Sequence, residues 1–161
     1  MFQDFKDLLS SFNAHHVKYL VVDGYAVSFH AQPRTTKDID LFVKADPENA
    51  RAVYAALMAF GAPVGSINIG DLQDPNKFIR FGREPVAIDI LPHIDGVDFD
   101  GAWNRRVENV IVPETGLTAF FISKEDLIAS KLAAGRTRDL ADVEEIREAA
   151  ASAKKPTESE S

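Results

Sequence analysis

Residues 20–41, with the sequence LVVDGYAVSFHAQPRTTKDIDL, decide the fold class. The apolar run Tyr19–Val22 predicts a short buried strand that ends in a turn at Asp23-Gly24. The next residues, 24–30, fit a short helix, and Asp38–Val43 predicts a second strand. This succession of strand, turn, helix and strand is typical of a protein that mixes helices with a sheet.

The flanking sequence continues the alternation. Apolar residues at helical spacing from Phe2 to Phe12 predict a first helix, and Asp46-Pro47 has the N-cap signature of another that ends near Gly61. Further strands are predicted at 77–81, 85–91, 107–112 and 117–122, with helices at 99–105, 123–135 and 139–150. We therefore expect an α/β (α+β) fold, in which helices flank a mixed β-sheet and a short helical segment follows.

Length and composition predict one globular domain. The chain has 161 residues, of which 45% are hydrophobic and 27% charged, and we expect a single domain at 1–152 and a disordered polar tail at 153–161. The absence of cysteine excludes disulfides, thiolate catalysis and cysteine-ligated metals.

Charge and hydropathy bear on partners and location. The formal net charge of -7 argues against broad binding of duplex DNA, although it leaves room for a local basic patch. No apolar run approaches the length of a membrane span, and Asp4 stands where a signal peptide needs positive charge. The sequence thus predicts a cytoplasmic protein with no membrane partner.

Three aspartates are the strongest candidates for chemistry. Asp38 and Asp40 are two residues apart on a predicted strand and leave the same face, where they either bind a hard cation such as Mg²⁺ or belong to a solvated surface. Asp89 interrupts the apolar run 86–91, which is typical of a central strand. A buried carboxylate needs a partner or a cation, so a third acid beside the first two explains Asp89 better than a half-exposed strand does.

Two blocks of sequence resemble a known superfamily. Residues 20–30 and 33–41 resemble the signature of the DNA polymerase β-like nucleotidyltransferases: an apolar strand, a Gly-Gly or Gly-Ser turn, a short helix, and Asp-x-Asp on the next strand. A third carboxylate follows on a later strand. Residues 126–131 and 136–143 resemble the C-terminal pattern of the bacterial abortive-infection and toxin–antitoxin branch. The motifs together span most of residues 20–145.

The resemblance implies a metal-dependent enzyme that moves a nucleoside monophosphate from an NTP to an RNA (tRNA-like) or protein hydroxyl. It implies that Asp38 and Asp40 hold two Mg²⁺ or Mn²⁺ ions, and that Asp89 holds the catalytic metal and helps to deprotonate the acceptor. It also implies a cognate antitoxin or another partner protein. Because the large C-terminal helical domain of longer members has no counterpart here, we expect few acceptor contacts from this chain itself.

The start of the short helix is the candidate nucleotide site. Gly24 lets the backbone approach a triphosphate, and the free N–H groups of a helix start favour anions. Ser28 is a candidate for a phosphate or sugar contact. The resemblance places Lys131 against the phosphates, while a lysine that snorkels from a packed helix is an equally good interpretation.

Other charged residues have open roles. Arg34 either binds phosphate or pairs with Asp38, and Asp139 is expected to cap a helix. Asp142 is a candidate for orienting Lys131. Four arginines line an acceptor groove or form a solvated face: Arg80, Arg83, Arg105 and Arg106.

One residue departs from the signature, because Asp23 occupies the first position of its glycine turn. We expect Asp23 to cap the helix that begins at Gly24 and to repel a triphosphate. Two hypotheses therefore stand: an active nucleotidyltransferase, favoured by the three carboxylates, and a catalytically weak or inactive binding or regulatory module of the same fold, favoured by Asp23.

Overall fold

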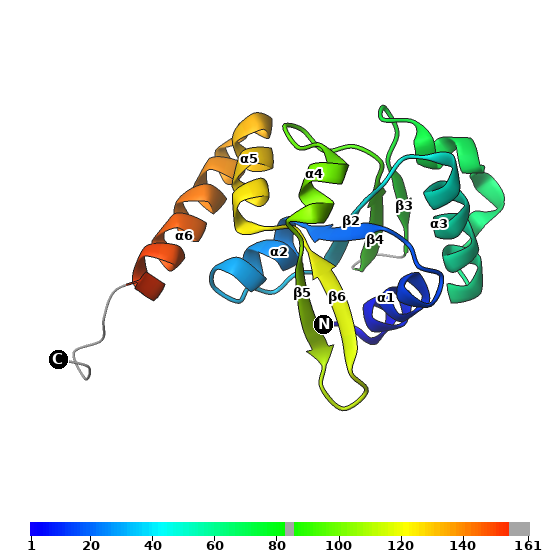
Figure 1. Cartoon of the computed structure of the whole chain (residues 1–161), viewed down its shortest axis with the longest axis horizontal. Coiled ribbons are helices and arrows are strands. Elements are labelled where there is room, and N and C mark those ends of the chain that lie inside the picture. The colour runs from blue at the N-terminus through cyan, green and yellow to red at the C-terminus, as the bar shows by residue number, and fades with distance from the viewer. Residues whose placement is uncertain (83–85, 155–161) are drawn as a thin grey trace.

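The computed structural model describes residues 1–82 and 86–154, so the first residue of the predicted strand at 85–91 and most of the predicted tail at 153–161 lie outside the described residues. Its centre is one six-stranded sheet (Figure 1). The strands are β1 (Tyr19–Val22), β2 (Asp38–Val43), β3 (Ile79–Phe81), β4 (Ala87–Leu91), β5 (Val107–Val112) and β6 (Leu117–Phe121). Their order across the sheet is β3-β4-β2-β1-β6-β5.

The sheet is mixed, as the sequence predicted. β2 runs parallel to β4 and β1 runs parallel to β6, whereas β1 and β2 are antiparallel. The helices and the 3-10 helices are α1 (Gln3–Ala14), α2 (Asp23–His30), α3 (Pro47–Phe60), η1 (Val64–Ser66), η2 (Ile69–Gln73), α4 (Phe99–Asn104), α5 (Lys124–Ala134) and α6 (Thr137–Lys154). In the part of the chain that is described, no helix has the length and apolarity required to cross a membrane.

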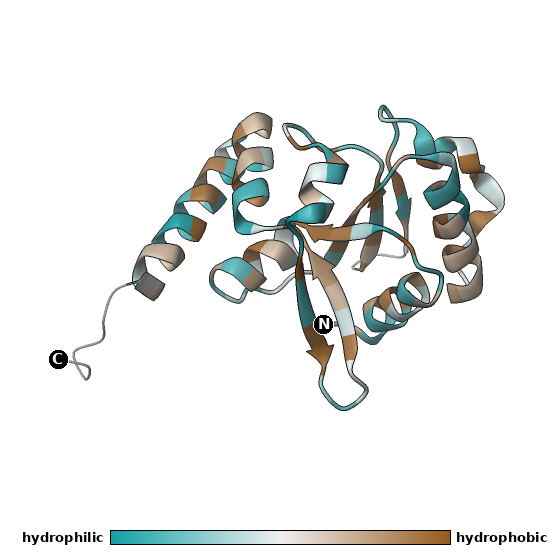
Figure 2. Cartoon of the chain, in the orientation of Figure 1, coloured by the Kyte–Doolittle hydropathy of each residue, from teal (hydrophilic) through white to brown (hydrophobic). Residues whose placement is uncertain are grey.

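Helices cover both faces of the sheet. Phe12 of α1 packs on Tyr19 with 5.6 Å between ring centroids, and Phe99 of α4 packs on Phe42 at 5.0 Å. Tyr19 pairs with Val43, the neighbour of Phe42, and successive side chains of a strand point to opposite faces. α1 and α4 therefore lie on opposite sides, and the strands between them are mostly apolar (Figure 2). Asp38 and Asp40 share the face of Phe42.

The helix boundaries with strong local signals lie where they were predicted. Asp46 caps α3 by accepting a hydrogen bond from the Asn49 amide at 2.7 Å, and Gly61 ends that helix at a φ of 97°. Ser123 caps α5, which ends at Gly135 with a φ of 67°. Left-handed backbone of this kind favours glycine, so these positions were readable from the sequence.

Two predictions about helix starts were wrong. α2 begins at Asp23 rather than at Gly24, its N-cap is Val22, and no side chain caps it. The Asp23 carboxylate instead turns to a lysine on α5, described below. α6 begins at Thr137 and extends to Lys154, so it is longer than the predicted helix. Arg136, which precedes α6, donates its backbone N–H to the Asp139 carboxylate at 3.2 Å, as expected for an acid near a helix start.

Candidate active site

A cleft of about 460 Å³ opens over the first half of β2 and the middle of β4, between the start of α2, the loop before β2, and helices α5 and α6. It brings together six of the seven site residues predicted from the sequence: Gly24, Arg34, Asp38, Asp40, Asp89 and Lys131. The described residues that line it do not include Ser28, whose hydroxyl accepts a hydrogen bond from the Arg34 amide at 3.2 Å.

The three predicted aspartates converge because of strand register. Asp40 is the direct partner of Asp89 in the parallel pair of β2 and β4. Asp38 lies two residues before Asp40, so alternation keeps its side chain on the same face. Asp89 is buried, with 7% of its surface exposed, which agrees with its predicted place in a central strand.

Arg80 lies among these carboxylates. It stands on β3 directly opposite Asp89, and its guanidinium donates to both oxygens of Asp89 at 2.8 and 3.1 Å. The same Nη2 atom donates to Asp38 at 3.1 Å. The sequence presented Arg80 only as one of four arginines that line an acceptor groove or form a solvated face. The missing signal is non-local, because the contact depends on which strand pairs with β4.

Asp40 is held in an environment that opposes its charge. Burial, together with the negative charges of Asp23, Asp89 and Asp38, raises the pKa of the Asp40 carboxyl from 3.8 to about 8. A carboxyl that is protonated at neutral pH beside two other acids is typical of a functional site rather than of a structural ion pair.

The donor chemistry fits a divalent cation, since carboxylate oxygens are the preferred ligands of Mg²⁺ and Mn²⁺, and a cation would relieve the charge repulsion at Asp40. As the side chains stand, however, no set of three acidic or histidine side chains within residues 1–82 and 86–154 is placed to hold one ion together. The Arg80 guanidinium lies between Asp38 and Asp89, so a shared cation requires that this arginine move.

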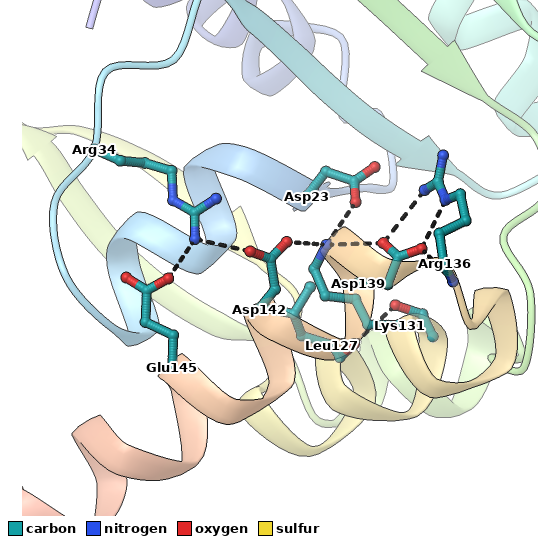
Figure 3. Close-up of polar contacts among 9 residues, drawn as sticks. Asp23, Arg34, Leu127, Lys131, Arg136, Asp139, Asp142 and Glu145 are labelled. Atoms are coloured by element: carbon teal, nitrogen blue, oxygen red, sulfur yellow. Dashed lines mark hydrogen bonds and ion pairs between the residues drawn. The ribbon is translucent and has the colours of Figure 1, made fainter.

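Lys131 is the centre of the other side of the cleft (Figure 3). Its Nζ lies 2.9 Å from Asp142, 3.3 Å from Asp23 and 3.5 Å from Asp139, and only 5% of its side chain is exposed. Burial alone would lower the pKa of this amine, but the contacts with Asp142 and Asp23 outweigh burial and raise it. Lys131 thus reaches the cleft as a cation that three carboxylates already neutralise. Asp142 touches it, as the sequence suggested.

Of the two roles expected for Arg34, the ion pair with Asp38 is not formed, and the binding of phosphate stays a prediction. The Arg34 guanidinium donates to Asp142 at 3.0 Å and to Glu145 at 2.7 Å, so it pairs with α6 and not with Asp38 (Figure 3). The cause of this pairing is a tertiary contact between distant segments of the chain. α6 packs beside α2 and presents two acids, one helical turn apart, to the loop that carries Arg34.

Asp23 and Gly24 show how the first turn of α2 is built. Asp23 has a φ of 53°, a left-handed conformation that aspartate tolerates better than most residues and that glycine adopts freely. Gly24 is required for another reason: a Cβ atom there would lie 2.8 Å from Cγ2 of Thr36, in the loop before β2. The turn therefore meets the loop at a distance that only glycine permits.

The remaining arginines divide between structural roles. Arg105 forms a two-bonded ion pair with Asp126 at 2.9 and 3.0 Å, and Arg106 stacks over the Trp103 ring at 3.9 Å. Neither lines the cleft. Arg83 lies outside the described residues.

The arrangement of sheet, cleft and aspartates defines the class of protein. The chain is similar to the crystal structure of the lincosamide antibiotic adenylyltransferase LnuA bound to lincomycin, with a TM-score of 0.56 over 91% of this chain and 96% of that chain. At 16% sequence identity, this likeness shows the fold, which is that of the nucleotidyltransferases.

Sequence comparison then identifies the family. Residues 1–148 match the family described as "Nucleotidyltransferase of unknown function (DUF6036)", and the chain belongs to it. No curated protein matches the sequence. Family and fold together confirm the resemblance to nucleotidyltransferases, while the acceptor and the biological role stay predictions.

Proposed function

We propose that this protein transfers a nucleoside monophosphate from an NTP to a hydroxyl group of an RNA or protein acceptor. The observation that carries the proposal is the convergence of Asp38, Asp40 and Asp89 in one cleft, with the pKa of Asp40 raised to about 8. A site that concentrates negative charge in this way, in a fold used for nucleotidyl transfer, is suited to a divalent cation and an anionic substrate.

In this proposal Asp38, Asp40 and Asp89 hold Mg²⁺ or Mn²⁺, which, when bound, neutralises charge on the reacting phosphate. The acceptor oxygen bonds to the α-phosphorus as the bond to pyrophosphate breaks. Asp89, buried at the floor of the cleft, takes the acceptor proton. Gly24, which lines the cleft at the start of α2, contacts the nucleotide. Because the positions of these groups are set by strand register, the acids are arranged before substrate arrives.

The direct test is metal-dependent consumption of labelled NTP. The protein is incubated with each of the four α-labelled NTPs and Mg²⁺ or Mn²⁺, with total RNA or cell lysate as acceptor. A hydroxylated small molecule such as lincomycin is included because the structurally similar adenylyltransferase binds it. We expect label in RNA or protein, lost with EDTA and with Asp40→Asn. Glu114→Gln, in the exposed turn between β5 and β6, is the matched control and should keep activity.

A second candidate function is that of a catalytically weak or inactive binding or regulatory module. Asp23 projects negative charge at the start of α2, and Arg80 contacts two of the three acids. These features suit a binding or regulatory module that has lost turnover. Such a protein would bind an NTP or a partner without consuming NTP, so absence of transfer to every acceptor, together with measurable NTP binding, would favour this function.

The biological role that we propose is that of a cytoplasmic toxin–antitoxin component whose partner is a cognate antitoxin. Induced expression in a bacterial host tests it. We expect growth arrest with the natural chain and normal growth with Asp40→Asn at equal protein level. Normal growth with both chains, in a protein that transfers NMP in vitro, would instead favour a housekeeping role.

A further inference from the structure

Five cationic side chains line the cleft, and they fall into two groups: Arg34, Arg80 and Lys131, which have carboxylate partners, and Lys37 and Arg138. In the first group, Arg34 contacts Asp142 and Glu145, Arg80 contacts Asp38 and Asp89, and Lys131 contacts three acids. The positive charge of each of these three side chains is therefore already partly neutralised by carboxylates.

Lys37 and Arg138 are different. Both are exposed at the cleft wall, and their side chains form no ion pair, hydrogen bond or ring contact with the described residues. Lys37 directly precedes Asp38 on the wall formed by the loop before β2. Arg138 lies in the first turn of α6, four residues before Asp142 and therefore on the same helix face, which turns to the cleft.

The negative charge of the cleft makes cations without carboxylate partners important for the binding of a polyphosphate. Five acids line it, namely Asp23, Asp38, Asp40, Asp89 and Asp142, so a polyphosphate enters a site already rich in negative charge. A cation that is free of carboxylates can form charge-assisted hydrogen bonds to phosphate oxygens without breaking an existing ion pair. A paired cation gains less, because the carboxylate that it leaves then loses its partner.

We propose that Lys37 and Arg138 bind the triphosphate of the incoming NTP, the first from the loop before β2 and the second from the first turn of α6. Lys131, which the family resemblance placed at the phosphates, instead holds α2 against α5 and α6 through its carboxylate contacts. This inference rests on the proposed function in that it takes an NTP as the ligand of the cleft.

The test is binding of Mg²⁺–ATP and of Mg²⁺–tripolyphosphate, measured by calorimetry on the full chain. Tripolyphosphate isolates the phosphate contacts from those of the base and sugar. We expect Lys37→Gln and Arg138→Gln each to weaken binding of both probes about fivefold or more, with a shallower dependence of affinity on salt than in the natural chain. Both side chains are exposed, so the thermal stability of these variants should be unchanged.

Two matched controls separate a local contact from the general loss of a positive charge. Arg147→Gln removes an exposed arginine from α6 nine residues after Arg138, about two and a half turns away and hence on the opposite helix face. Lys6→Gln removes a lysine from α1, which does not line the cleft. Both should bind the two probes as the natural chain does.

The outcomes distinguish this inference from the proposed function. Natural-strength binding of both probes by Lys37→Gln and Arg138→Gln would overturn the inference and leave the proposed function standing. Loss of binding in these variants, in a natural chain that binds NTP but transfers nothing, would support the inference and overturn the proposed transfer. A natural chain that binds neither probe would overturn both.

Discussion

On the helix side of the cleft, Lys131 is surrounded by Asp23, Asp139 and Asp142. On the sheet side, Asp38, Asp40 and Asp89 converge, and Arg80 forms ion pairs with Asp38 and Asp89. The two sides respond to burial in opposite ways. Burial opposes the charge of Asp139 and Asp142, yet Arg136 and Lys131 hold the pKa of these two carboxyls below the usual range. Across the cleft, the pKa of Asp40 is raised to about 8.

This contrast distinguishes a structural ion network from a functional cluster. On the helix side each buried charge has its counter-charge, so that network stabilises the packing of α2, α5 and α6. On the sheet side three carboxylates converge on the cleft around Arg80, so negative charge exceeds positive charge there. An excess of negative charge of this kind is typical of a site that is completed by a ligand.

The largest effect is expected from removing the centre of the helix-side network. Lys131→Met would leave Asp139 and Asp142 without their buried cation, and breaking a buried ion pair at one partner costs about 3–5 kcal/mol of unfolding free energy. Urea denaturation measures this loss of unfolding free energy. Lys124→Met, at the start of the same helix, is the control and should change stability by less than about 0.5 kcal/mol. Equal losses in both variants would show that the network is not the source.

The next effect, opposite in sign, comes from Asp40→Asn on the sheet side. In EDTA this variant should be more stable than the natural chain by about 2 kcal/mol or more at pH 8, since each unit of pKa shift corresponds to about 1.4 kcal/mol. Transfer activity should be lost. A lower melting temperature of the variant at pH 8 would mean that the Asp40 carboxylate holds structure through hydrogen bonds.

The pH dependence of stability follows from the same shift. Because the pKa of Asp40 is raised in the folded protein, folding is favoured while the carboxyl stays protonated. That stabilisation is complete below the unfolded value of 3.8 and is lost as pH rises to about 8. In the Asp40→Asn protein the decline over this range should be smaller, and thermal unfolding in EDTA at several pH values measures the difference.

A smaller effect is expected at Arg80, where removing a cation from the sheet side makes the two sides of the cleft differ still more in charge. Arg80→Gln removes a cation from between Asp38 and Asp89, so it should tighten Mn²⁺ binding about fivefold. The metal-free protein should lose about 1 kcal/mol or less of unfolding free energy, because the arginine side chain is 47% exposed. Calorimetry and denaturation measure the two quantities, with Arg147→Gln as control. Unchanged Mn²⁺ affinity would show that the guanidinium does not compete with the ion.

The smallest effect is expected at Asp23, which lies between the two clusters. Asp23→Gly loses a 3.3 Å contact with Lys131 but relieves the cost of a positive φ, so stability should change by less than about 1 kcal/mol. Loss of the charge should tighten Mg²⁺–NTP binding about threefold, most clearly at low salt. Asp23→Asn removes the negative charge without the added backbone freedom of glycine, and it should bind NTP as tightly as Asp23→Gly. Equal or weaker binding than the natural chain would show that Asp23 does not repel the phosphates.

The sequence predicted features with a local cause. The bounds of β1 and β2, the Asp46 and Ser123 caps, and the pairing of the strands that carry Asp40 and Asp89 all follow from hydropathy, capping residues and the one acid in an apolar run. Short 3-10 segments such as η1 and η2 have no such periodic signal, and they were missed.

What the sequence did not predict depends on contacts between distant segments. Arg80 finds Asp89 only through the pairing of β3 with β4, and Arg34 finds Asp142 only because α6 packs beside α2. The Asp23 cap was inferred from residue type alone. A buried lysine on another helix competes for that carboxylate, and no local rule anticipates such competition.

The pairing of β1 with β6 has a consequence for the order of folding. Val21 lies beside Phe121, and Lys131 reaches Asp23 across 108 residues of chain, so both contacts close a very long loop. Long-range contacts of this kind form late, because their loop-closure entropy must be overcome first. The half of the sheet that contains β2, β4 and β3 can therefore assemble while the lysine is still remote, which leaves three clustered acids without the helix side of the cleft. Hydrogen exchange pulsed during refolding should protect the amides of β2 and β4 before those of β6, and simultaneous protection would contradict this order.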